Sequence, residues 1–182
     1  MTLEEFKESV AHYCDEEQLE NENYFFTAVN GVLREILTRF PIVKSYEYEL
    51  LRTDSQTTVK MDGLVDDFAS FSTPAFKADF LPPVAPLIDG RLGEMVFPEW
   101  VEGKCRIYYN KKIPTVNRDT LDVPIEDERL ELLTLGTAYR LLLIDESYDA
   151  AKSVKTMYDE TAYFMESNMK GADVRVKDVT GW

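Results

Sequence analysis

Apolar residues recur at helical spacing near the start of the chain. From Asn23 to Phe40 they fall at three- and four-residue steps on one face, which predicts an amphipathic helix. The face consists of Phe25, Val29, Val32, Ile36 and Phe40, widened by Phe26, Leu33 and Leu37. Pro41 ends this helix. A shorter helix is predicted before it, because Thr2 followed by Glu5 forms a capping-box pattern.

The last third of the chain returns to the helical period. Apolar residues lie on nearly every face between Leu130 and Ile144, which is typical of a helix in the middle of a bundle. Pro124 suits the start of this helix. A further helix is predicted from Asp145-Glu146-Ser147 to about Met169, with Gly171 just past its end. Its apolar stripe is Tyr148, Ala151, Val154, Tyr158, Ala162, Met165 and Met169.

The middle of the chain alternates apolar and polar residues instead. This period predicts strands at Tyr46–Leu51, Thr57–Met61 and Lys104–Asn110. Five prolines between positions 74 and 98 exclude helix there and restrict any strand to a sheet edge. Asp89-Gly90 indicates a turn.

These patterns predict an α+β fold in which a small antiparallel β-domain, sandwich-like or barrel-like, is inserted into a helical bundle. Neither helical end has a core of its own, so the two ends should pack together. The expected parts are 1–40 and 121–170 for the bundle, 41–120 for the β-rich insertion and 171–182 for an extended tail. In that tail Val174, Val176 and Val179 alternate with charged residues before Trp182, and we expect these four residues to dock on a partner.

The formal net charge of −14 narrows the choice of partners. It argues against binding driven by nucleic-acid phosphates or by an anionic membrane surface, since both need a basic face. The opening residues are acidic rather than basic and apolar, and no apolar run reaches the roughly 20 residues that span a bilayer. We therefore expect a soluble protein made in the cytoplasm.

Residues that could carry out catalysis are few. His12 is the single histidine, and its neighbours in sequence cannot build a triad. Cys14 and Cys105 are too isolated for a zinc site or a disulfide framework, so reduced, partly buried thiols are expected. The acidic clusters are Asp15-Glu16-Glu17, Asp66-Asp67, Glu126-Asp127-Glu128 and Asp145-Glu146, without EF-hand spacing. The tyrosines that could form a stacking surface are Tyr46, Tyr48, Tyr108 and Tyr109, although packing is the commoner role of strand tyrosines. We expect no catalytic residues, no cofactor and no metal.

The segment from Arg106 to Met165 resembles the head–tail adaptor and tail-tubular proteins of tailed bacteriophages. A Tyr-Tyr-x-x-x-x-Pro strand end at 108–114 leads to a Val-Pro helix start at 123–124. A leucine-rich helix at 132–142, an acidic turn at 145–146 and a long helix with Tyr158 and Tyr163 follow. The remaining chain resembles this family only in the order and type of its elements.

The resemblance implies a virion structural protein with no catalytic residues. Such a protein assembles as a ring, commonly a dodecamer, in the neck between capsid and tail. Its partners would be the portal protein, a tail or nozzle protein and further copies of itself. DNA would pass through the ring without specific binding, because acidic walls repel phosphates. The protein would be made in the cytoplasm of a host bacterium.

Three other interpretations remain open. The chain could be another virion connector part, such as a stopper or a tail-completion protein. Its acidity also fits a DNA-mimic inhibitor that binds a basic protein. An enzyme with a carboxylate-bound metal is the third alternative.

Overall fold

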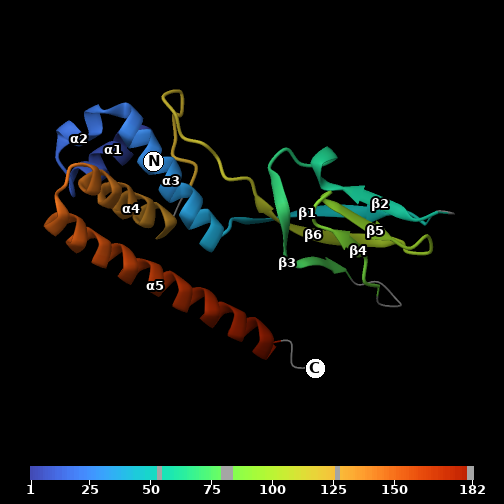
Figure 1. Cartoon of the computed structure of the whole chain (residues 1–182). Coiled ribbons are helices and arrows are strands. Elements are labelled where there is room, and N and C mark those ends of the chain that lie inside the picture. The colour runs from blue at the N-terminus through green and yellow to red at the C-terminus, as the bar shows by residue number, and fades with distance from the viewer. Residues whose placement is uncertain (53–54, 79–83, 126–127, 180–182) are drawn as a thin grey trace. The chain divides into compact units, whose positions relative to one another are not determined.

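The computed structural model of the chain describes residues 1–52, 55–78, 84–125 and 128–179. The chain forms two compact units, a helical unit of Met1–Arg39 and Pro114–Trp182 and a β-unit of Phe40–Ile113. The predicted α+β class is confirmed, with helices formed by both ends of the chain and small antiparallel sheets formed by its middle (Figure 1). The β-unit ends before the expected boundary at 120. Residues 114–120 belong to the helical unit, where Asn30 holds Val116 through two hydrogen bonds of 2.8 Å.

Three helices come from the N-terminal part of the chain. Helix α1 spans Leu3–Ala11, and its capping box between Thr2 and Glu5 is formed as predicted. Helix α3 spans Glu22–Arg39 and buries the predicted apolar face, but it ends one residue before Phe40. Helix α2, Glu16–Glu20, was not predicted. Its acidic residues suggested a charge cluster rather than a turn of helix.

Helix α4, Glu128–Ile144, is the centre of the helical unit. It contacts α1, α3 and α5, and most of its residues from Leu132 to Leu142 are buried, as its all-round apolar sequence predicts. Helix α5, Tyr148–Val179, lies beside α4 (Figure 1). It buries Ala151, Val154, Tyr158, Ala162 and Met165. Tyr148 was expected on that stripe, but it is 62% exposed because it stands at the first turn of the helix.

The expected extended tail is wrong for residues 171–179, which continue α5 as helix. Gly171 lies inside the helix and does not end it. The valines were grouped by strand geometry, in which residues two apart lie on the same face, whereas residues two apart on a helix are separated by about 200°. Trp182 lies outside the described residues.

The β-unit contains two three-stranded antiparallel sheets. In the first, the central strand β6 (Gly103–Lys111) pairs with β1 (Val43–Leu50) on one side and β3 (Phe68–Ala78) on the other. In the second, β5 (Glu94–Phe97) lies between β2 (Thr57–Lys60) and β4 (Leu87–Asp89). A short 3₁₀ turn, η1 (Met61–Gly63), follows β2.

Both sheets contribute to one apolar core, as expected for a small sandwich. The register places Tyr46 opposite Ile107 and Tyr48 opposite Cys105, so the predicted apolar faces of β1 and β6 coincide. The core also takes in Met95 and Phe97 of β5. Pro74 interrupts β3, which is an edge strand, in agreement with the expected restriction.

The contact between α3 and α4 depends on two glycines. A Cβ atom on Gly136 would lie 2.5 Å from a methyl carbon of Val32 and 3.1 Å from the ring of Tyr158. Gly31 leaves room for the guanidinium of Arg140, which donates to Glu35 at 2.9 Å. A glycine inside a helix costs about 1 kcal/mol relative to alanine. Close packing of α3, α4 and α5 at this point offsets that penalty.

Replacing Gly136 with valine should therefore destabilise the helical unit. We expect Gly136→Val to lower the free energy of unfolding by about 1–3 kcal/mol, because the new side chain overlaps Val32 and Tyr158. Urea denaturation followed by circular dichroism measures this. The control is Ala150→Val, at an exposed position of α5, which should change stability by less than about 0.5 kcal/mol. Equal effects of the two substitutions would contradict the packing argument.

Candidate functional site: an acidic–apolar groove in the helical unit

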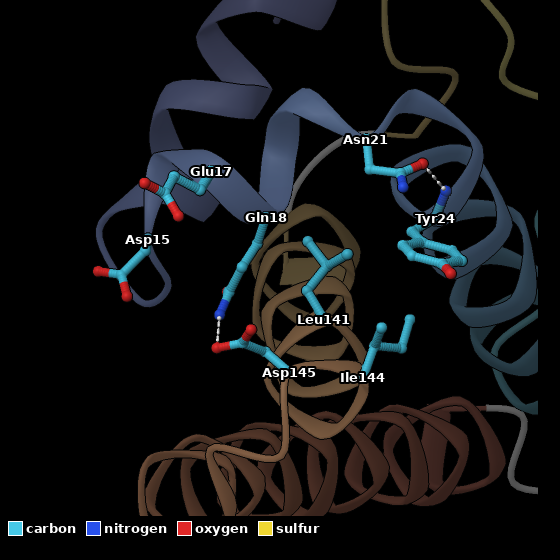
Figure 2. A pocket seen from close by; sticks show the side chains of 8 residues that line it. All are labelled: Asp15, Glu17, Gln18, Asn21, Tyr24, Leu141, Ile144 and Asp145. Carbon is cyan, nitrogen blue, oxygen red and sulfur yellow. Dashed lines mark hydrogen bonds between the residues drawn. The ribbon is translucent and has the colours of Figure 1, made fainter.

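A groove of about 370 Å³ opens between α2, the start of α3 and the end of α4 (Figure 2). We name it the acidic–apolar groove after the side chains that line it. They are Asp15, Glu17, Gln18, Asn21, Tyr24, Leu141, Ile144 and Asp145. In Figure 2 Asp15, Glu17 and Asp145 lie to one side, and Tyr24 and Ile144 lie to the other.

Helix ends position the polar residues of this groove. Asp15 is the N-cap residue of α2, but its side chain makes no capping hydrogen bond. Asp145 follows α4 directly, and its carboxylate accepts a hydrogen bond of 2.8 Å from the Gln18 amide nitrogen. The Gln18 amide oxygen is buried and has no hydrogen-bond partner among the described residues. The asparagine at the start of α3, Asn21, accepts from the Tyr24 backbone N–H at 3.3 Å.

The apolar side of the groove is incompletely covered. Tyr24 is 50% exposed and Ile144 is 49% exposed, although Leu141 beneath them is buried. Carboxylates on one side and exposed apolar groups on the other suit a ligand that carries a positive charge next to an apolar group. Among the described residues, the lining holds no histidine, cysteine, serine or lysine.

The sequence did not predict this groove. Asp15 and Glu17 are separated from Asp145 by most of the chain, and only the α2–α3–α4 packing brings them together. The acidic clusters at 15–17 and 145–146 were the one signal, and each has an ordinary explanation as charge near a helix end.

A second exposed feature lies on α5. Tyr163 and Phe164 are adjacent and each is 70% exposed, and Met157 is 41% exposed. Phe164 lines a shallow hollow of about 270 Å³ with Glu131 of α4 and Glu160 of α5. These exposed apolar side chains form the second candidate surface of the helical unit.

The two thiols and the histidine identified in the sequence are not among the described residues that line the groove. Cys14 and Cys105 are both free and buried, as expected. Burial raises the pKa of each thiol to about 11, so both stay protonated at neutral pH. His12 is exposed at the C-terminal cap of α1.

The tyrosines of the β-unit do not form a continuous stacking surface. Tyr46, Tyr48 and Tyr109 face the core, while Tyr108 points to the opposite side of β6. The Tyr109 hydroxyl donates to Asp67 at 2.9 Å, and Asp67 also pairs with Lys44 at 2.6 Å. The Lys44 ammonium, more than the Tyr109 hydroxyl, lowers the pKa of Asp67. This part of the Asp66-Asp67 cluster is therefore used in packing.

The remaining expected site residues are the acidic cluster at 126–128 and the valines near the end of α5. Glu126 and Asp127 lie outside the described residues. In the described ranges no group of three or more His, Cys, Asp or Glu side chains is arranged to hold a metal ion. The docking residues Val174, Val176 and Val179 lie on the last turns of α5 and remain a prediction.

The chain was compared with protein-family models and with curated proteins. No protein-family model matches the chain, and no curated protein matches it. In the part of the chain that the structure describes, no helix has the length and apolarity to cross a membrane.

A polar network joins α3, α4 and α5 near the middle of the bundle. The Tyr158 hydroxyl donates to one oxygen of Glu35 at 3.1 Å, and Arg140 donates to the other oxygen at 2.9 Å. Burial, followed by the charge of Glu35, raises the pKa of Tyr158 to about 12 from the usual 10. The phenol is thus held neutral in the folded state.

This network predicts a loss of stability at alkaline pH. Because the pKa of Tyr158 is higher in the folded state, its contribution is complete below pH 10 and is lost as pH rises towards 12. We expect Tyr158→Phe to lower the free energy of unfolding by about 0.5–1.5 kcal/mol at pH 8. The difference from the wild type should shrink between pH 10 and 12. Urea denaturation at pH 8, 10 and 11.5 measures both effects.

The matched control is Tyr163→Phe, since Tyr163 lies on the same helix and is 70% exposed. It should stay within about 0.5 kcal/mol of the wild type at pH 8. If the difference between Tyr158→Phe and the wild type is constant across this range, the raised pKa of Tyr158 is wrong.

Proposed function

We propose that this protein is a virion structural protein, a head–tail adaptor that assembles with copies of itself into a ring between portal and tail. The proposal rests on the resemblance of residues 106–165 and on an exposed surface. The fold agrees with what that resemblance implies, since helices from both chain ends form a bundle and a β-unit is inserted between them.

The observation that carries the assembly part of the proposal is the outer side of α5. Tyr163 and Phe164 expose 70% of their surface on a helix whose other side is already buried against α4. Aromatic residues are enriched at protein interfaces and often supply much of the binding energy. A subunit of a larger assembly would cover them.

The distribution of charge supports the role of a DNA conduit. The helical unit carries 23 acidic and 11 basic residues, whereas the β-unit carries 11 and 9. A ring wall built from the helical unit would repel DNA phosphates and allow the duplex to move through. The surface potential of such a wall would weaken as ionic strength rises.

Imaging tests the proposal directly. We expect electron microscopy of the virus particle, with the protein labelled by a C-terminal tag and antibody, to show the label on a ring between capsid vertex and tail. Absence of the protein from particles, or its isolation in a stoichiometric complex with a basic enzyme, would contradict the proposal and favour the DNA-mimic interpretation.

The α5 surface can be tested by substitution. We expect Tyr163→Asp with Phe164→Asp to reduce incorporation into particles roughly tenfold or more, because a buried interface aromatic is commonly worth 2 kcal/mol or more. Thermal unfolding of the isolated protein should change little, since both side chains are exposed. Quantitative immunoblotting of purified particles measures incorporation.

The control is Ser153→Asp with Thr156→Asp, which adds the same charge at exposed polar positions of the same helix. Normal incorporation of the aromatic variant, or an equal loss for the control, would show that this surface is not specifically buried in the assembly.

A further inference from the structure

The tip of the β-unit is an exposed hairpin. Strands β4 and β5 pair from Leu87 opposite Val96 to Asp89 opposite Glu94, and residues 90–93 form the turn (Figure 1). The three leucine and isoleucine side chains of the hairpin point outward. Leu87 is 73% exposed, Ile88 is 45% exposed and Leu92 is 60% exposed. Arg91 stands among them, also exposed, and forms no ion pair within the described residues.

The hairpin is held in one conformation. The Asp89 carboxylate accepts hydrogen bonds from the backbone N–H groups of Arg91, at 2.9 Å, and Leu92, at 3.2 Å. Gly93 has a φ of +64°, and a Cβ there would lie 2.8 Å from the buried ring of Phe68. Its carbonyl accepts from the Met61 N–H at 3.0 Å. A preorganised loop loses little conformational entropy when it binds.

The hairpin and the acidic–apolar groove are complementary in charge and polarity. The groove has the carboxylates of Asp15, Glu17 and Asp145 on one side and exposed Tyr24 and Ile144 on the other (Figure 2). The hairpin offers one guanidinium next to exposed leucine and isoleucine side chains. Guanidinium groups bind carboxylates through paired hydrogen bonds, which makes arginine a common anchor at interfaces.

The size of the groove suits this occupant. Its volume of about 370 Å³ lies at the low end of the range for ligand pockets, roughly 300–1,000 Å³. The opening can therefore accept the side chains at the tip of a hairpin.

We propose that the β4–β5 hairpin of one copy docks in the acidic–apolar groove of a second copy, with Arg91 against the carboxylates and Leu92 against Tyr24 and Ile144. This inference rests on the proposed self-assembly and names the contact that produces it. The two surfaces are different patches of the chain, and a ring requires that they meet head-to-tail, so that each copy gives its hairpin to one neighbour and receives a hairpin from another. Such head-to-tail contacts close into rings or extend into filaments.

Sedimentation velocity of the full chain at several concentrations tests the contact. We expect the wild type to self-associate. Arg91→Glu should raise the dissociation constant roughly ten- to hundredfold, as the loss of a charge-assisted hydrogen bond predicts. The groove variant Asp15→Lys with Glu17→Lys should have a similar effect, because it replaces two of the carboxylates that line the groove with ammonium groups. The Asp15 side chain makes no capping hydrogen bond to α2, so its replacement removes no helix cap.

The most decisive sedimentation experiment mixes the hairpin variant with the groove variant. Arg91→Glu retains an intact groove and the groove variant retains an intact hairpin, so a mixture should associate where neither protein does so alone. Combining all three substitutions in one chain should also restore association, because the charges are exchanged. Matched controls are Arg52→Glu in the β-unit and Glu8→Lys with Glu20→Lys in the helical unit, all at exposed positions outside the hairpin and the groove. These should associate like the wild type.

A wild type that stays monomeric at all accessible concentrations overturns the inference. Equal association of wild type and variants also overturns it. Loss of association without recovery on mixing overturns the pairing of these two surfaces. The adaptor function is decided separately, by the position of the wild-type protein in the particle.

Discussion

Most residues of helix α4 from Leu132 to Leu142 are buried, and the helical unit depends on covering this stretch. Helix α3 packs on one part of it, α5 on another and α1 on a third. The approach of α3 is close enough that position 136 tolerates no side chain beyond hydrogen without displacing Val32. Because α1 and α3 come from the beginning of the chain and α4 and α5 from the end, this core forms only when the two ends meet.

The inserted β-unit allows the two chain ends to meet, because the start of β1 and the end of β6 are neighbours. Val43 pairs with Asn110, and the Lys111 N–H donates to the Ile42 carbonyl at 2.9 Å. The segment after the insertion is then fixed to α3 by Asn30, which bonds both the N–H and the carbonyl of Val116. The N-terminus is tied to the same return segment, since the Leu3 N–H donates to Leu121 and the Val123 N–H donates to Met1.

Much of this fold could be predicted from local patterns, because periodicity reports which face of an element is buried. The alternation in β1 and β6 gave the correct core faces, and the Thr2–Glu5 spacing gave the start of α1. Helix α2 and strands β3, β4 and β5 were missed. Three to five residues carry too little periodicity for α2, β4 and β5 to be recognised, and Pro74 interrupts the longer strand β3. The alternating valines after Gly171 suggested an extended tail, but the helix of α5 continues through them. The acidic–apolar groove is a product of tertiary packing, and no local pattern joins Asp15 to Asp145.

The adjacency of β1 and β6 has a consequence for how such a chain can change over time. Residues 43 and 110 remain neighbours whatever the length or shape of the segment between them, so lengthening, shortening or replacing that segment leaves the connection to α3 and α4 at the same spacing. Closing a longer loop costs only about 0.6 kcal/mol for each doubling of its length. Selection could therefore remodel the inserted unit for a new neighbour while the helices keep an unchanged core.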